Sequence, residues 1–345
     1  MSLAKGRQTH KEIKSQFLAW RQSMEYLKTT TRAVKEFFNM RKNKTIILTG
    51  CGTSYYLAQA GAFMVADILG VKTMAVPASE VFFFPKVYIG KDTLLIALSR
   101  SGVTTEVLKA VEACRRTGGS ILAITCRDSS PLVRQADFTL IATNAEDSSV
   151  VQTRSFTTMY IMLLGLASII GNRYDYIEEL SMLSLLSEQT LDNSQALVEK
   201  LVKDEKIQTF IFLGSGHNYG LACGAMLNLK ETALLHTEAY HFLELRHGPF
   251  SIINPATLVI GFLSDLVRDY ETAVLQEVMD AGARVLALSR TNIDGVHFCI
   301  SIPNLGEYTR SIAFFPVLHL LALYKALARG VDPDAPPHLR RVITL

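Results

Sequence analysis

A short segment rich in hydroxyl side chains follows an apolar run in the first half of the chain. This segment, residues 99–105, reads SRSGVTT and precedes a helix-forming run; residues 50–54, GCGTS, stand in the same place after an earlier apolar run. A helix N-terminus offers unpaired N–H donors and a positive dipole, and hydroxyls add donors that approach closely. The two segments together predict an anion site, and the simplest matching anion is the phosphate of a small metabolite.

Helix capping and dinucleotide binding are the alternatives to a phosphate site at these segments. Ser and Thr are favoured N-caps, but one cap needs one such residue and this turn holds several. The GCG of residues 50–52 and the GSG of residues 214–216 also echo a dinucleotide-binding fingerprint. However, Tyr55 and Tyr219 stand where its third glycine belongs, and no P-loop sequence occurs. We therefore favour phosphate binding.

A second polar stretch, residues 228–253, lies in the otherwise apolar second half. Its candidates for proton transfer are Glu231, Glu238, Glu244, His236, His241 and His247. Carboxylates and imidazoles serve general acid–base chemistry, but they also lie unused on surfaces. By residue type alone, Glu231 could be a solvated carboxylate on a helix face, and His247 a histidine fixed beside the Gly-Pro turn.

Both polar segments belong to a module that occurs twice. Apolar β-type runs begin at Thr45 and Thr209, and the next runs begin 48 residues further on, at Thr93 and Thr257. A third pair follows 27 residues later in both halves, and a fourth pair closes each unit. Strand runs that alternate with helical segments predict parallel sheets covered by helices on both faces. Ligands of such sheets bind beyond the carboxyl ends of the strands.

The repeat divides the chain into four expected parts. They are a helical segment over residues 1–40, a first module over 41–173, a helical connection over 174–206, and a second module with a C-terminal tail over 207–345. In the second module the counterpart of the hydroxyl-rich turn reads LSDLVRD and has lost nearly all the hydroxyls. We therefore expect only the first module to hold a phosphate.

Composition limits the function classes. The 345 residues are 49% hydrophobic, and 35 Lys and Arg against 32 Asp and Glu give a net charge of +3. Scattered basic residues at this balance argue against a nucleic-acid partner. Five cysteines without close pairing or metal-ligand spacing predict reduced thiols in a cytoplasmic protein, with no metal site.

Two apolar runs and the N-terminus indicate whether the chain could span a membrane or carry a signal peptide. The runs at residues 156–171 and 312–328 fall short of the roughly 20 clean apolar residues that span a bilayer. We therefore expect buried core or interface helices and no membrane partner. The first residues lack the apolar core of a signal peptide.

A series of motifs along the chain resembles the sugar isomerase (SIS) family. In order they are GCGTS, PASEVF, LSRSGVTTE, SSVVQTRSFTT, LGSGHNYGLACGAMLNLKE, HTEAYHFLELRHGP and GVDPDAPPHLRRVITL. Within the family they are similar to the isomerase half of glucosamine-6-phosphate synthase and to stand-alone amino-sugar-phosphate isomerases and deaminases. The resemblance implies an α/β fold of two tandem flavodoxin-like SIS modules, and a homodimer with its active site near the subunit interface. It also implies no metal or organic cofactor.

The resemblance assigns roles to particular residues. It implies substrate contacts, to the phosphate or the sugar, at Cys51, Gly52, Thr53, Ser54, Ser99, Arg100, Ser101, Thr104 and Gln152. Glu231 resembles the base that moves a proton between C1 and C2 of the open-chain sugar. His247 resembles the histidine that opens the sugar ring, typically in the neighbouring subunit's site. Arg341 takes the place of a tail lysine and joins the catalytic candidates.

The chain departs from the synthase pattern at several positions. Asn228 replaces a lysine one turn before the glutamate, and Arg100 replaces the usual glutamine, adding a charged donor suited to phosphate. Arg341 cannot form a Schiff base. The glutaminase half is not part of this sequence, so we expect no ammonia to be drawn from glutamine.

The sequence therefore predicts a cytoplasmic hexosamine-6-phosphate deaminase/isomerase, which converts an aldose amino-sugar phosphate into a ketose phosphate and ammonia. Two alternatives stay open. One is a deglycase that acts on fructosamine-type 6-phosphates, and the other is a sugar-phosphate sensor without catalysis.

Overall fold

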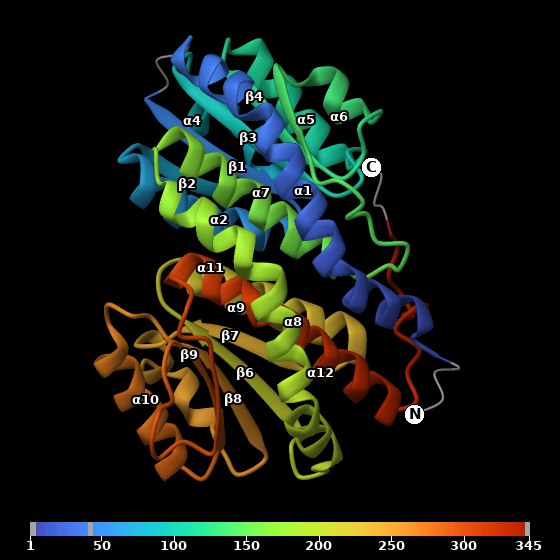
Figure 1. The fold of residues 1–345 in the computed structure, drawn as a ribbon, viewed down its shortest axis with the longest axis vertical. Helices are drawn as coiled ribbons and strands as arrows, with labels where there is room; N and C mark the ends of the chain where they lie inside the picture. The colour runs from blue at the N-terminus through green and yellow to red at the C-terminus, as the bar shows by residue number, and fades with distance from the viewer. Residues whose placement is uncertain (1–4, 41–43, 342–345) are drawn as a thin grey trace. The chain divides into compact units, whose positions relative to one another are not determined.

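The structure is a computed structural model that describes residues 5–40 and 44–341 (Figure 1). The described chain forms two compact units. The first, called here the first module, contains residues 15–40, 44–148, 152–182 and 340–341; the second module contains residues 5–14, 149–151 and 183–339. Two long helices, α1 (Arg7–Asn39) and α8 (Tyr174–Lys203), contribute to both units. The four-part division read from the sequence stays a prediction.

The first module is built on a parallel five-stranded sheet. Its strands are β1 (Thr45–Gly50), β2 (Lys72–Pro77), β3 (Thr93–Ser99), β4 (Ser120–Thr125) and β5 (Phe138–Ile141), in the order β2-β1-β3-β4-β5. The helices between them are α2 (Thr53–Leu69), α3 (Ala78–Phe83), α4 (Pro85–Tyr88), α5 (Thr105–Arg116), α6 (Pro131–Gln135) and α7 (Arg154–Ile170). This strand order is the flavodoxin-like order, as predicted, and it reverses between β1 and β3, where such folds bind ligands.

Helices cover both faces of this sheet, which explains the continuously apolar strands. Ile47 of β1 and Leu95 of β3 belong to the core cluster under α3 and α5. The next residue, Leu48, faces α2 and α7 on the other side: a Cβ on Gly61 of α2 would stand 2.8 Å from Leu48 and 2.2 Å from Leu163 of α7. Successive strand residues thus pack against opposite helix layers.

The second module repeats the architecture. Its strands are β6 (Thr209–Gly214), β7 (Thr237–His241), β8 (Thr257–Phe262), β9 (Arg284–Ser289) and β10 (Phe298–Ser301), in the order β10-β9-β8-β6-β7. Its remaining elements are α9 (His217–Ala233), η1 (Glu244–Arg246), η2 (Pro249–Ile252), α10 (Arg268–Asp280), α11 (Glu307–Ala313) and α12 (Phe315–Ala328). The register is also repeated, because Thr45 pairs with Thr93 as Thr209 pairs with Thr257.

Strands β2 and β7 were not predicted. Both are edge strands with half-exposed residues and no continuous apolar run. Hydrophobic periodicity is weak in such strands, because only part of each one faces a core.

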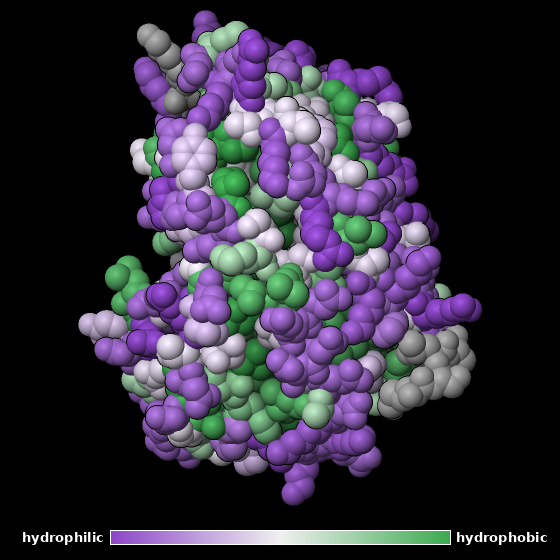
Figure 2. Space-filling view, viewed as in Figure 1, coloured by the Kyte–Doolittle hydropathy of each residue, from purple (hydrophilic) through white to green (hydrophobic). Residues whose placement is uncertain are grey.

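The apolar helices are buried in protein. Segment Glu307–Ala328, which comprises α11 and α12, has 22 residues and a mean hydropathy of 1.6, so by length it could cross a bilayer. The helical segment is longer than the apolar run of residues 312–328 because it begins at Glu307 and includes Arg310. However, 83% of its most apolar 18-residue stretch is buried, which is typical of a core helix, as the sequence predicted. The face drawn in Figure 2 carries mostly hydrophilic residues, with smaller hydrophobic areas between them.

Candidate active site

The turn after the first strand has the same backbone in both modules. Gly52, the N-cap of α2, has φ 53° and ψ −126°, and Gly216, the N-cap of α9, has φ 56° and ψ −128°. Glycine adopts this conformation without a steric penalty. The preceding Gly50 lies so close to Ser54 that a Cβ would stand 2.8 Å from its backbone. The Gly-x-Gly pattern therefore serves a sharp turn that starts α2 at the carboxyl end of β1.

A small pocket lies in the first module where the strand order reverses. It has a volume of about 40 Å³ and is lined by Cys51, Ser54, Leu98, Ser99, Arg100, Ser101, Thr104, Val107, Gln152 and Arg341. One water needs about 10–15 Å³, so the pocket accepts a group of a few heavy atoms, such as a phosphate, rather than a whole sugar. Gly52 and Thr53 do not line it: Gly52 shapes the turn, and Thr53 is buried at the start of α2.

The hydroxyls of the second turn do more than cap α5. Thr104 occupies the N-cap position, but its side chain makes no capping hydrogen bond. Ser99 Oγ accepts the N–H of Gly102 at 3.1 Å, and Ser101 Oγ accepts the N–H of Val103 at 3.4 Å. A hydroxyl that accepts such a bond keeps its own proton as a donor. Bracing the turn and binding an anion are therefore compatible.

Arg100 brings a buried positive charge to this pocket. The residue is 5% exposed, and its Nη2 donates to the main-chain carbonyl of Arg341 at 2.8 Å. Burial lowers the pKa of Arg100, and the charge of Asp147 opposes that shift. An arginine remains a cation at neutral pH. A buried cation among hydroxyls is the environment that a phosphate dianion requires.

Arg341 is fixed in the wall of the pocket by an acidic residue. Its guanidinium donates to Glu146 Oε1 at 2.7 Å and to the main-chain carbonyl of Asp147. Arg127 Nη2 lies 2.6 Å from the same Glu146 oxygen. Burial alone would raise the pKa of Glu146, but its hydrogen bond and ion pair with Arg127, together with the charge of Arg341, lower the pKa overall. Glu146 is therefore ionised and holds Arg341 in place.

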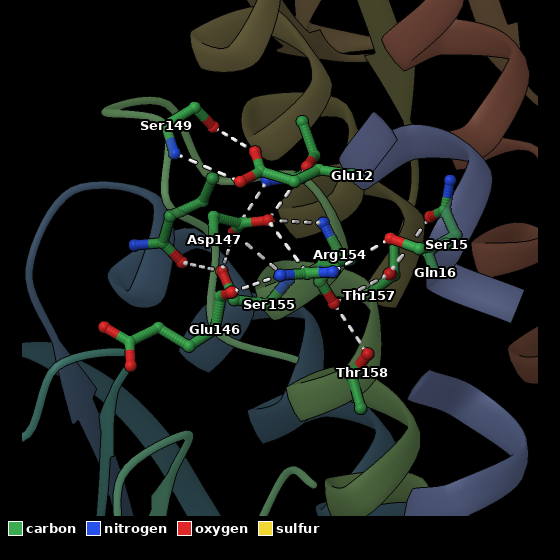
Figure 3. A network of polar contacts seen from close by, with 12 residues as sticks. Glu12, Ser15, Gln16, Glu146, Asp147, Ser149, Arg154, Ser155, Thr157 and Thr158 are labelled. Atoms are coloured by element: carbon green, nitrogen blue, oxygen red, sulfur yellow. Dashed lines mark hydrogen bonds and ion pairs between the residues drawn. The ribbon is translucent and has the colours of Figure 1, made fainter. Parts of the chain in front are cut away.

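Asp147 fixes the segment that carries Gln152, a role that the sequence did not reveal. It is fully buried and accepts the N–H groups of Thr153 (3.1 Å), Arg154 (3.2 Å) and Ser155 (3.2 Å), as well as the hydroxyls of Thr153 and Ser155. Figure 3 shows Asp147 beside Arg154 and Ser155. These N–H groups begin α7, and helix starts leave them unpaired. Ser155 Oγ lies 3.3 Å from Gln152 Oε1. An acidic residue shortly before a Thr-x-Ser helix start is the signal that could have identified Asp147.

The cysteines of the chain are free thiols. Burial raises the pKa of Cys51 to about 12, with a further contribution from the charge of Glu106. At neutral pH Cys51 therefore lines the pocket as a neutral thiol. The thiolate, which is the reactive form of cysteine, is not populated there.

The candidates for proton transfer lie in the second module. Glu231 is half-buried in the last turn of α9, and His247 is exposed at the end of η1. Glu238 accepts a hydrogen bond from Tyr240. His241 stacks on Tyr219 with ring centroids 3.7 Å apart. These contacts give Glu238 and His241 local structural partners.

A comparison with known protein families identifies the family of the first module. Residues 39–169 match the SIS domain family, which confirms the resemblance seen in the sequence: the chain carries an SIS domain. The second module has the same strand order.

Individual relatives extend the similarity over nearly the whole chain. Glutamine–fructose-6-phosphate aminotransferase (isomerizing) of Clostridium tetani is 30% identical over 325 residues, which cover 89% of this chain and 52% of that protein. The chain thus spans about half the length of the curated relatives it matches.

Two solved structures are similar in fold. A tagatose-6-phosphate ketose/aldose isomerase from Escherichia coli has a TM-score of 0.88 and 26% identity, covering 99% of this chain and 98% of that one. A glucosamine-6-phosphate deaminase from Thermotoga maritima has a TM-score of 0.79 and 27% identity, covering 95% of this chain and 100% of that one.

Proposed function

We propose that the chain is a phosphosugar isomerase, and specifically a hexosamine-6-phosphate deaminase/isomerase. The observation that carries this proposal is the pocket of about 40 Å³ in which hydroxyls of two strand-to-helix turns meet the buried Arg100. Its size and donors suit the phosphate of a sugar. The similarity to a glucosamine-6-phosphate deaminase over 95% of this chain supports the choice of an amino sugar.

In this proposal the phosphate pocket positions the sugar, and positioning is itself a large part of catalysis. The phosphate ligands are Ser54, Ser99, Arg100, Ser101 and Thr104, with Thr53 nearby and Gln152 toward the sugar. Because the phosphate lies away from the reacting carbons, its binding fixes their place without taking part in the proton transfers.

The chemistry then needs a base and an acid. Glu231 removes the proton from C2 of the open-chain aldose and returns it to C1. The C1 oxygen takes up a proton while the amino nitrogen gives one up, so that C1 becomes an alcohol and C2 an imine. Water adds to this imine and releases ammonia, giving the ketose phosphate. His247 opens the sugar ring by moving a proton between the ring oxygen and the C1 hydroxyl, which suits a group that titrates near neutrality.

The proposal extends to assembly and location. We infer a cytoplasmic homodimer in which His247 reaches the active site of the neighbouring chain. No metal or organic cofactor takes part in the proposed reaction, because proton transfers and water addition suffice.

An assay for ammonia and fructose 6-phosphate after incubation with glucosamine 6-phosphate tests the proposal. The wild type should form both products, and Glu231→Gln should form neither while still binding the sugar phosphate. The matched variants Glu238→Gln and Glu244→Gln change other carboxylates of the same stretch and should keep turnover. Binding of the sugar phosphate by the wild type without either product would refute the proposed activity.

A second candidate is ketose/aldose isomerisation without loss of ammonia. The TM-score of 0.88 to a tagatose-6-phosphate ketose/aldose isomerase favours it. Interconversion of hexose 6-phosphates that requires Glu231 and proceeds without ammonia would select this candidate. Release of an amine other than ammonia from a fructosamine 6-phosphate would select a deglycase, and binding without turnover of any of these sugars would select a sensor.

A further inference from the structure

The second module contains the counterpart of the phosphate pocket. The repeated register and the repeated glycine turn place Asn218 where the first module has Ser54, and Ser264 where it has Arg100. Asp265 likewise corresponds to Ser101. The sequence shows that this turn has few hydroxyls, and the structure shows which acceptor its donors contact.

The Glu307 carboxylate accepts hydrogen bonds from the two turns at these corresponding positions. Glu307 Oε2 accepts the N–H of Asp265 at 2.7 Å and the hydroxyl of Ser264 at 3.1 Å, and Asn218 Nδ2 lies 3.4 Å from Glu307 Oε1. These donors come from both turns, just as the polar lining of the first pocket does. Two N–H or O–H donors on one oxygen are the contacts that a phosphate oxygen would make.

Both arginines and carboxylates surround the Glu307 carboxylate. Arg310, 1% exposed, donates to Asp265 Oδ1 at 2.7 Å, and Arg290 Nη1 lies 3.8 Å from Asp265 Oδ2, so two cations balance the charge of Asp265 beside Glu307. A second buried carboxylate, Glu271, accepts the N–H of Ser264 at 2.7 Å. Buried donors are rarely left without an acceptor, so the donors of this turn would be unsatisfied without the Glu307 carboxylate.

We propose that the second module retains an anion site of the phosphate class and that the Glu307 carboxylate is its resident occupant. Each chain then binds a single phosphate, in the first module, because the second site is filled from within. The count of one phosphate rests on the pocket of the proposed function, whereas occupancy of the second site by Glu307 does not depend on the reaction.

Removal of the carboxylate tests the inference. Calorimetric titration with inorganic phosphate should give about one site per chain for the wild type and about two for Glu307→Ala. Without added anion, Glu307→Ala should melt at a lower temperature than the wild type, and phosphate or acetate should raise its melting temperature by more than it raises that of the wild type. Glu277→Ala, which removes an exposed carboxylate of α10 paired with Arg246, is the control and should show no such rescue.

Further measurements and variants distinguish a wrong inference from a variant that does not fold. A folded Glu307→Ala that gains neither a second phosphate nor extra stabilisation by anions would overturn the inference. Should this variant not fold in chloride, refolding in phosphate at equal ionic strength replaces the titration: recovery in phosphate alone supports the inference, and equal yields contradict it. Adding Ser99→Ala and Ser101→Ala weakens the first site only, so a failure of the first phosphate pocket is distinguished from a failure of this proposal.

Discussion

Arg100 sets the electrostatics of the phosphate pocket. Its guanidinium is buried beside three hydroxyl-bearing residues of the same turn, and a carbonyl of the chain end accepts its hydrogen bond. A buried cation interacts strongly with a phosphate because little water screens the pair. We therefore expect the charge at this position, more than the hydroxyls, to decide how tightly the proposed site binds phosphate.

Replacing this cation should weaken binding far more than turnover. Arg100→Gln removes one charge-assisted interaction, worth about 1.5–3 kcal/mol, so the Kd for inorganic phosphate should rise roughly 10–100-fold. The KM for the sugar phosphate should rise similarly, with a smaller change in kcat. Arg116→Gln, at an exposed ion pair with Glu112, is the control, and an unchanged Kd in Arg100→Gln would remove Arg100 from the site.

Asp147 acts on the pocket by holding the segment before α7. In Asp147→Asn an amide group faces N–H donors, so hydrogen bonds to Thr153 or Ser155 are lost. We expect the free energy of unfolding to fall by about 1–3 kcal/mol in urea titrations. We also expect a higher KM for the sugar phosphate, because Gln152 is no longer fixed. Asp128→Asn, at an exposed position, should alter neither quantity, and an unchanged KM in Asp147→Asn would limit Asp147 to a structural role.

At the scale of elements, both modules use the same strand-to-helix turn. Gly52 and Gly216 share one backbone conformation, yet only the first turn borders the phosphate pocket. The turn is thus a requirement of the fold, and the hydroxyl cluster is a feature of one copy.

This distinction predicts two effects for one substitution. Gly52→Ala and Gly216→Ala should each lower the free energy of unfolding by about 1–3 kcal/mol, since alanine is strained at this backbone conformation. Only Gly52→Ala should also weaken phosphate binding. Gly90→Ala is the control, because a Cβ there meets no atom nearer than 3.8 Å. Equal loss of phosphate binding in Gly216→Ala would contradict the assignment of the site to the first module.

At the scale of the whole molecule, the buried carboxylates of the second module make stability depend on pH. Burial raises the pKa of Glu271 from its ordinary 4.5 to about 7, against hydrogen bonds from Ser215 and Ser264 that lower it; Glu307 adds to the rise. Asp265, Arg310 and Arg290 are further charged groups of this cluster, and His217 Nδ1 lies 3.6 Å from Glu307 Oε1. Between these two pH values the folded chain holds a proton that the unfolded chain has released. The free energy of unfolding therefore falls as pH rises through this window.

Replacing Glu271 by a group that does not titrate should reduce the pH dependence of the free energy of unfolding. Relative to the wild type, Glu271→Gln should gain on the order of 3 kcal/mol of stability between pH 4.5 and pH 8. Urea titrations at pH 5 and pH 8 measure this gain. Glu277→Gln, on the exposed side of α10, should follow the wild type at both values. Parallel profiles for Glu271→Gln and the wild type would show that Glu271 titrates normally.

Assembly can be tested by complementation between inactive chains. If His247 serves the neighbouring chain's site, a mixed dimer of Glu231→Gln and His247→Ala contains one complete site. Equal mixing with subunit exchange should then restore about a quarter of the wild-type activity. Each variant mixed with itself is the control. No recovery, with mixed dimers shown by mass spectrometry, would place His247 in its own chain's site.

Much of the fold and part of the site followed from sequence. Equal spacing of apolar runs determined two parallel-sheet modules, because strands buried on both faces must be continuously apolar. It also placed Ser54, Ser99 and Ser101 together, since the carboxyl ends of neighbouring parallel strands meet at one edge of a sheet. Strands β2 and β7 were missed, because polar residues interrupt their apolar ones in KTMAVP and TEAYH.

Only the tertiary structure decided the contacts between residues far apart in sequence. It brought Arg341 to Arg100 and seated Glu307 on the turn at Ser264, and no local pattern indicates either pair. Hydrogen-bond donors left by a turn must find some acceptor, but residue types do not say which one. That choice depends on which side chains the packing of distant helices and the chain end brings within reach.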